Sequence, residues 1–175
     1  MAHLSFASEA VVDHIVSWLR AYLESSGMDG WIVGVSGGVD SAVTSTLCAM
    51  TGAPTVCVEM PIHQAPEQVS RAAAHIDALC QRHPRVRRST VSVSEVYDVF
   101  SQALPDGPDA SAGLAMANAR ARLRMTTLYT LGQRSRLLVA GTGNKVEDFG
   151  VGFYTKYGDG GVDVSPIADL NKTEV

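Results

Sequence analysis

The chain has 175 residues, a formal net charge of -4, and a composition that is 46% hydrophobic and 18% charged. This length supports one sizeable core and is short for two ordinary enzyme domains, so we expect a single domain over residues 1–175. The weak negative charge argues against a nucleic-acid partner held through its phosphate backbone, and no apolar run reaches the ~18 residues of a membrane span. Because the sequence has no signal peptide at its start and no CxxC among its three cysteines, we expect a soluble, cytoplasmic protein without a membrane partner.

Helical and strand patterns alternate along the sequence. Apolar residues at helical spacing predict helices, and short apolar runs that end in glycine or polar residues predict buried strands. In chain order the sequence predicts a helix over 8–26, a strand over 31–35, a helix over 40–50, a strand over 55–60, a helix over 66–83, a strand over 89–93, a helix over 94–104, a turn-rich exposed loop over 105–113, a helix over 114–133 and a strand over 136–141.

This alternation predicts an α/β fold, a three-layer sandwich in which helices flank a central parallel sheet. In such sheets ligands bind beyond the carboxyl ends of the strands, at the point where the strand order reverses. Glycine-marked turns follow Val35 and Ala140, each at the end of a predicted strand. We therefore expect the functional site to lie at these two turns.

The string SGGVDS, residues 36–41, follows a predicted strand and opens a predicted helix. Successive amides there, together with the positive end of the helix dipole, suit an oxyanion such as a phosphate. Asp40 stands where a Walker-type loop has lysine, and this carboxylate would repel a phosphate unless a divalent cation lay between them. The alternative interpretation is a tight turn in which Asp40 is only the helix N-cap.

SGGVDS resembles the pyrophosphate-binding loop of the ATP pyrophosphatases, which have the adenine nucleotide alpha-hydrolase-like fold. The resemblance implies cleavage of ATP between its alpha and beta phosphates. Three later segments, NARARLRM (118–125), GTGNKVED (141–148) and the run from 154 to 175, resemble the NAD synthetase family within that group. The resemblance then implies a ligase that adenylates deamido-NAD with ATP and amidates it with ammonia, releasing AMP and pyrophosphate.

The family resemblance assigns roles by position. Asp40 and Glu147 would bind Mg2+, although a lone Glu147 is also compatible with a solvated helix charge. Arg120, Arg122 and Arg124 cannot all share one helix face, and only the resemblance favours Arg122. The implied ATP-binding residues are Gly34, Val35, Ser36, Gly37, Gly38, Val39, Asp40, Ser41, Thr142 and Lys172, and the implied deamido-NAD-binding residues are Arg122, Lys156, Asp159 and Asp163.

The resemblance also implies a homodimer with deamido-NAD, ATP and ammonia as substrates. Free ammonia is expected as the nitrogen donor because no glutaminase-like segment precedes the first helix. The family pattern continues beyond residue 175, so this sequence is expected to lack the family's C-terminal segment. Two alternatives remain open: another ATP pyrophosphatase, either GMP synthetase-like or tRNA-modifying, and a noncatalytic nucleotide-binding module.

Overall fold

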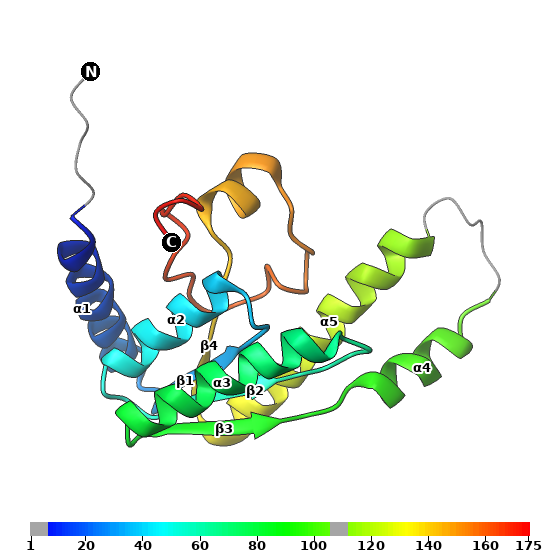
Figure 1. The fold of residues 1–175 in the computed structure, drawn as a ribbon, viewed down its shortest axis with the longest axis horizontal. Helices are drawn as coiled ribbons and strands as arrows, with labels where there is room; N and C mark the ends of the chain where they lie inside the picture. Colours follow the sequence, from blue (N-terminus) through cyan, green and yellow to red (C-terminus); the bar gives the residue numbers. More distant parts are fainter. Residues whose placement is uncertain (1–6, 106–111) are drawn as a thin grey trace.

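A computed structural model describes residues 7–105 and 112–175 of the chain. Five α-helices, four β-strands and one π-helix follow one another there (Figure 1). In chain order they are α1 (Ser8–Ser26), β1 (Gly30–Gly34), α2 (Val39–Met50), β2 (Thr55–Glu59), α3 (Pro66–Arg82), β3 (Val86–Thr90), α4 (Ser94–Gln102), α5 (Ala112–Ser135), β4 (Leu137–Ala140) and η2 (Val146–Val151). None of the helices in the described part of the chain is long and apolar enough to cross a membrane.

The four strands form one parallel sheet in the order β3-β2-β1-β4. Side chains alternate between its faces, as the pleat of a strand requires. In β1, Trp31 and Val33 pack with α1 and α2, whereas Ile32 packs on the opposite face with residues of α5 such as Leu128. Helices therefore cover both faces (Figure 1), and the predicted three-layer α/β sandwich is confirmed.

The strand order reverses beside β1. From β1 the chain adds β2 and then β3 on one side, and afterwards returns to place β4 on the other side of β1. The carboxyl ends of β1 and β4 therefore flank a topological switch point, where open α/β sheets bind their ligands. The turns after Val35 and Ala140 meet there, as the sequence predicts.

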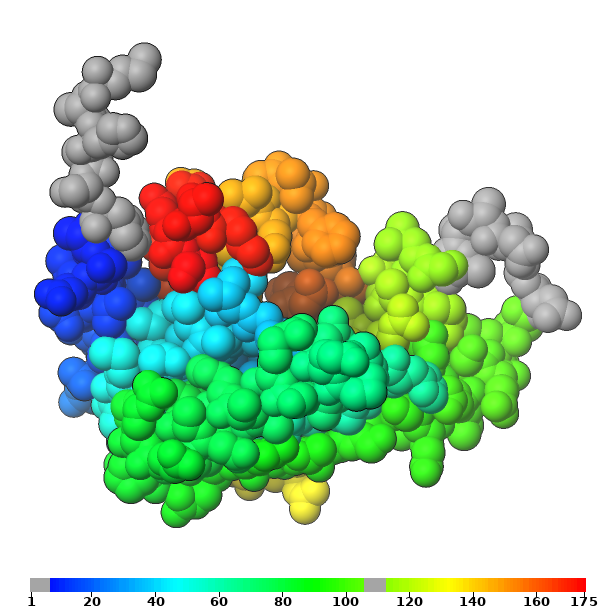
Figure 2. Space-filling model, viewed as in Figure 1, coloured from blue at the N-terminus to red at the C-terminus, as the bar shows by residue number. Residues whose placement is uncertain are grey.

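The C-terminal part of the chain packs beside the carboxyl end of β4. Residues Ala140 and Val164 form a parallel bridge, and the Gly141 amide donates to the Val164 carbonyl at 2.8 Å. Leu170 and Val175 then pack against the cluster built from α1 and α2. Figure 2 shows this last segment, in red, between α1 and the beginning of α2. Residues far apart in the sequence thus meet around the start of α2.

The strand prediction over 89–93 is wrong in its position. The observed strand β3 pairs Val86 with Thr55 and Thr90 with Glu59, so it begins and ends three residues earlier. The apolar spacing of Val91 and Val93 suggested a buried strand there, but β3 lies at the sheet edge, where exposed polar residues are tolerated. In the predicted loop over 105–113, residues 106–111 lie outside the described part, and α5 already begins at Ala112.

Candidate functional site

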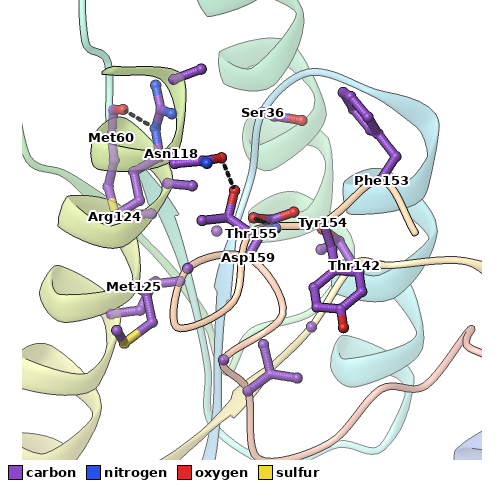
Figure 3. A pocket seen from close by; sticks show the side chains of 18 of the residues that line it. Ser36, Met60, Asn118, Arg124, Met125, Thr142, Phe153, Tyr154, Thr155 and Asp159 are labelled. Carbon is purple, nitrogen blue, oxygen red and sulfur yellow. Dashed lines mark hydrogen bonds between the residues drawn. The ribbon is translucent and has the colours of Figure 1, made fainter. Parts of the chain in front are cut away.

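A cavity of about 590 Å³ opens at the switch point, between the ends of β1 and β4 and one face of α5 (Figure 3). Its walls combine backbone at the strand ends with apolar and polar side chains, which is typical of ligand sites. The lining residues that the argument uses most are Ser36, Asn118, Arg124, Thr142, Thr155 and Asp159. Of the predicted site residues, Gly34, Val35, Ser36, Thr142 and Asp159 line this cavity.

The loop between β1 and α2 has the geometry of an anion-binding turn. Gly37 has φ +85°, and a Cβ atom there would lie 2.6 Å from the Gln68 carbonyl oxygen of α3, so glycine is required on both counts. The Ser41 hydroxyl accepts from the Ser36 amide at 3.2 Å and donates to the Gly38 carbonyl at 2.9 Å. These bonds hold the loop closed. The first amides of α2 have no acceptors within the helix, because the first amides of any α-helix lack a preceding turn.

Asp40 lies inside the first turn of α2, and the N-cap position is Gly38, which has no side-chain cap. The alternative interpretation of Asp40 as an N-cap is therefore wrong. The side chain of Asp40 points to residues from the other end of the chain instead. Its Oδ2 lies 2.5 Å from Lys172 Nζ, and its Oδ1 accepts from Asn144 Nδ2 at 3.0 Å.

Glu147 completes this group. Its Oε1 accepts from the same Lys172 ammonium at 3.1 Å, so the two carboxylates converge on one cationic position. The hydrogen bond from Lys172 to Asp40 raises the pKa of the lysine above its usual value; burial opposes this shift, and the hydrogen bond to Glu147 adds to it. The predicted pair of carboxylates and the predicted lysine are thus brought together by the fold.

The donor set suits Mg2+. That ion favours oxygen ligands and is commonly held by one or two carboxylates together with substrate phosphates and water. Asp40 Oδ2 and Glu147 Oε1 point at one position, and Lys172 Nζ contacts both, so this position already favours positive charge. The residues therefore fit a magnesium site next to the anion-binding loop.

The predicted deamido-NAD residues lie close to the cavity in three different settings. Asp159 lines the cavity and its Oδ1 accepts from the Thr155 amide at 2.9 Å. Arg122 lies outside the described lining and donates to the Lys156 carbonyl at 3.2 Å, so these two are neighbours. Asp163 accepts from the Val139 amide at 2.8 Å and from the Tyr129 hydroxyl at 3.0 Å, which ties it to β4 and α5.

The three arginines of α5 separate as the helical period requires. Arg120 donates to the Tyr97 hydroxyl of α4 at 3.1 Å, and Arg122 faces the loop that carries Lys156. Arg124 donates to the Met60 carbonyl at 3.0 Å and lines the cavity (Figure 3). Burial, and then the nearby Arg120, lower the pKa of Arg124.

Several cavity residues were missed from the sequence. One face of α5 faces the cavity, and the side-chain oxygen Oδ1 of Asn118 there accepts from the Thr155 hydroxyl at 2.9 Å (Figure 3). Helical spacing could have indicated that face, because its lining residues recur at the i, i+3 and i+4 positions of one helix face: Leu114, Ala117, Asn118, Ala121, Arg124, Met125 and Leu128. The sequence also gave no role to Asn144, although it is fully buried beside Asp40.

The cysteines are unsuited to nucleophilic chemistry. Cys48 and Cys57 are buried in the core, and Cys80 is half-buried. Burial, and then the nearby Cys80, raise the pKa of Cys57 to about 12, and burial raises the pKa of Cys48 as well. The reactive thiolate form is therefore disfavoured at these two positions.

Comparison with known proteins shows the family of the chain. The family model described as NAD synthase matches residues 11–175. The "NH(3)-dependent NAD(+) synthetase" of Sulfurisphaera tokodaii is 38% identical over 165 residues, which cover 94% of this chain and 57% of that protein. The solved "NMN synthetase from Francisella tularensis" superposes with a TM-score of 0.87 at 30% identity, over 97% of this chain and 68% of that one.

A third relative carries a nucleotide. The solved "glutamine-dependent NAD+ synthetase from Acinetobacter baumannii in complex with adenosine diphosphate" has a TM-score of 0.86 at 30% identity, over 99% of this chain and 33% of that one. This chain thus spans little more than half of the Sulfurisphaera tokodaii protein and a third of the Acinetobacter baumannii one. Since the family model matches almost the whole sequence, the chain belongs to the NAD synthase family.

Proposed function

We propose that this chain catalyses the ATP-dependent amidation of deamido-NAD to NAD, with ammonia as nitrogen donor and Mg2+ as metal cofactor. One observation carries the proposal. Asp40, Glu147 and Lys172 converge at the start of α2, at the switch point whose cavity is large enough for a nucleotide-sized ligand. Family membership supports the same activity.

ATP is proposed to bind with its phosphates at the start of α2. The amides of Val39, Asp40 and Ser41 are the first of that helix, and the Ser36 and Ser41 hydroxyls lie beside them. Lys172 would bind the phosphates directly, as a compact positive charge. Thr142 follows β4 and lines the cavity at the switch point, which supports a contact with the nucleotide.

Asp40 and Glu147 are the residues proposed to hold Mg2+. When bound, the ion would neutralise negative charge on the departing pyrophosphate. Lys172 would move from the two carboxylates toward the phosphates when ATP and the metal ion arrive, because Mg2+ would replace its ammonium as the cation between the two carboxylates. The loop amides and Lys172 would then stabilise the same developing charge from the protein side.

Two substitution steps complete the proposed reaction. A carboxylate oxygen of deamido-NAD attacks the alpha phosphorus of ATP, and the bond to pyrophosphate breaks as pyrophosphate leaves with its electron pair. Ammonia then attacks the activated carboxyl carbon, loses a proton to solvent, and displaces AMP. Catalysis comes from holding two anionic substrates together and neutralising charge, so neither step uses a protein nucleophile.

The deamido-NAD contacts are proposed for Arg122, Lys156, Asp159 and Asp163. Asp159 is supported by its place in the cavity wall, and Arg122 and Lys156 are supported by their mutual contact beside it. The contacts of Asp163 with Val139 and Tyr129 support an indirect contribution, since both its oxygens already accept hydrogen bonds. A homodimer is proposed on the family resemblance, and light scattering after size-exclusion chromatography tests it. A cytoplasmic location is proposed on the cysteine pattern and the composition of the first residues.

The Francisella tularensis relative motivates a second candidate. That protein is an NMN synthetase by name, so the second candidate product of this chain is NMN, formed from nicotinate mononucleotide by the same chemistry. Both substrates carry the same reacting carboxylate. Product analysis distinguishes the two candidates.

The test supplies the protein with ATP, Mg2+ and ammonium, and with deamido-NAD or nicotinate mononucleotide in parallel. We expect NAD, AMP and pyrophosphate in equal amounts from deamido-NAD, and no turnover with Asp40→Asn. NMN as the preferred product would reassign the substrate. ATP binding without either amide product would contradict the catalytic proposal and favour a noncatalytic nucleotide-binding module.

A further inference from the structure

Asn144 joins the Asp40 carboxylate to the backbone of Glu147, the second carboxylate residue of the proposed metal site. Its side chain is fully buried, and it lies outside the described lining of the cavity. Nδ2 donates to Asp40 Oδ1 at 3.0 Å, and Oδ1 accepts from the amides of Val146 and Glu147, both at 3.1 Å. One amide group therefore contacts Asp40 and the backbone that carries Glu147.

The chemistry of the partners fixes the orientation of this amide. Backbone N–H groups can only donate, so the oxygen of Asn144 must face Val146 and Glu147. The nitrogen then necessarily faces Asp40, whose ionised carboxylate only accepts. A flipped amide would place oxygen against carboxylate and N–H against N–H, so only one arrangement satisfies all three bonds.

The hydrogen bond from Asn144 fixes the direction of the other carboxylate oxygen of Asp40. Because Oδ1 is engaged by Asn144, the carboxylate is held with Oδ2 pointing at Lys172 Nζ, the position that Glu147 Oε1 also contacts. Asp40 and Asn144 are 104 positions apart in the sequence, so no local geometry of α2 could fix this alignment. Burial at 0% exposure keeps water from competing for the bond.

We propose that Asn144 is the positioning residue of the metal site: it aligns Asp40 and Glu147 so that both carboxylates point at one cation. The inference rests on the proposed function and adds a residue to it. Groups that orient metal ligands typically change metal affinity or activity by about 10–100-fold when they are replaced. Asn144 touches no reacting atom, so its effect is expected on the metal-dependent part of ATP binding.

The test measures ATP affinity by calorimetry in Mg2+ and again in EDTA. The ratio of the two dissociation constants measures the contribution of Mg2+ to ATP affinity, whereas the dissociation constant in EDTA measures the contribution of the rest of the ATP site. Asn144→Ser removes the donor to Asp40 and keeps an oxygen for the Val146 and Glu147 amides. We expect it to lower the Mg2+-dependent gain in affinity by about 10-fold or more, with little change in EDTA.

Two further variants complete the design. Leu79→Ala, in the buried part of α3, lowers stability without touching the site and should keep the wild-type ratio. Asn144→Leu keeps a similar side-chain volume and removes all three hydrogen bonds, so it should lower the ratio at least as much as Asn144→Ser.

The outcomes separate the inference from the function on which it rests. Wild-type ratios in both folded Asn144 variants would overturn the positioning role while leaving the metal site intact. If the ATP affinity of the wild-type protein were the same in Mg2+ and in EDTA, the proposed metal site would be overturned, and the positioning role of Asn144 with it. If neither variant folded by circular dichroism, Asn144 would belong to the folding core and the positioning role would also be overturned.

Discussion

Lys172 is the cation that the two carboxylates of the site share. Its Nζ contacts Asp40 at 2.5 Å and Glu147 at 3.1 Å, its side chain is 46% exposed, and it is the residue proposed to bind the phosphates of ATP. Lys172→Met should raise the KM for ATP by about 10-fold or more, because a charge-assisted hydrogen bond to a phosphate contributes about 1.5–3 kcal/mol. Steady-state kinetics at saturating deamido-NAD measures this effect.

Lys145→Met is the matched control for this prediction. Lys145 is also exposed and belongs to the same C-terminal region, but it has no proposed contact with the nucleotide. The same loss of charge there should leave the KM for ATP near its original value. Equal effects of the two substitutions would show that Lys172 acts only through general charge.

Tyr129 is expected to give the protein a distinct alkaline transition. Burial raises the pKa of its hydroxyl to about 12, with further contributions from the charge and hydrogen bond of Asp163. The folded state thus holds this proton more tightly than the unfolded state, where the pKa is about 10. By linkage, the free energy of unfolding must fall as the pH rises through the window from about 10 to about 12.

Tyr129→Phe should therefore flatten the pH dependence of stability in that window. Urea unfolding at about pH 9 and about pH 11 measures the change, because only the higher pH lies inside the window. Tyr22→Phe, which alters a tyrosine of α1 that is 37% exposed, serves as the control. An unchanged slope in Tyr129→Phe would show that ionisation of Tyr129 does not govern this transition.

At the residue scale, the sequence predicted those members of the site whose chemistry is visible in isolation. Asp40 is conspicuous in a loop built for anions, and Glu147 and Lys172 belong to segments that resemble a known family. Asn144 carries no such mark, because an asparagine after a glycine-rich turn is common and its partner lies 104 positions away. Its role depends on burial, which only the packed structure shows.

The junction of β1, α2 and α3 depends on one glycine. Gly37 has φ +85°, and a Cβ atom there would lie 2.6 Å from a backbone oxygen of α3. Gly37→Ala should lower the free energy of unfolding by about 2 kcal/mol, since both the backbone conformation and the contact are unfavourable. The loop amides should also shift, so ATP affinity should fall.

Gly38→Ala is the stability control for this prediction. Gly38 has φ -89°, and its added Cβ would meet only the Ser36 hydroxyl, at 3.4 Å. Its cost in urea unfolding should be no more than about 1 kcal/mol, because alanine is a weaker N-cap than glycine. Similar costs for the two variants would contradict the proposed close packing of α3 against Gly37.

Strand β3 is held to the sheet by an ion pair that the sequence did not indicate. Arg88 donates to Glu59 at 2.7 Å, and the Glu59 side chain is only 4% exposed. Arg88→Met would leave that carboxylate buried and without its cation, which should cost about 2–3 kcal/mol in urea unfolding, given that the arginine itself is partly exposed. Asp77→Asn removes the charge of the exposed second partner of Arg88, and it should cost less than about 1 kcal/mol in urea unfolding.

This ion pair also explains the misplaced strand. Sequence patterns favour apolar runs as strands, so the residues around Val91 and Val93 were favoured over the basic run that precedes them. An edge strand tolerates charged residues, and Arg88 lies within β3 because a buried partner is available on β2. If Arg88→Met and Asp77→Asn proved equally mild, the pair would not anchor the edge of the sheet.

The fold brings the first turn of α2 and the last residues of the chain together. Alternating strand and helix patterns predicted the parallel sheet and both glycine turns, because each depends on short stretches of sequence. The contact between Asp40 and Lys172 spans 132 positions and follows from the return of the chain to place β4 beside β1. Sequence patterns alone do not predict which residues so far apart in the sequence lie together. For Asp40 and Lys172, the family resemblance indicated the shared site.

The most direct test of the proposed reaction traces the two carboxylate oxygens of deamido-NAD. Deamido-NAD labelled with ¹⁸O in its nicotinate carboxylate is incubated with the protein, ATP, Mg2+ and ammonium, and the products are analysed by mass spectrometry. If the carboxylate attacks the alpha phosphorus of ATP, one labelled oxygen must leave on AMP and the other must remain in the amide of NAD. NAD formed together with unlabelled AMP would contradict activation of deamido-NAD by adenylation at this site.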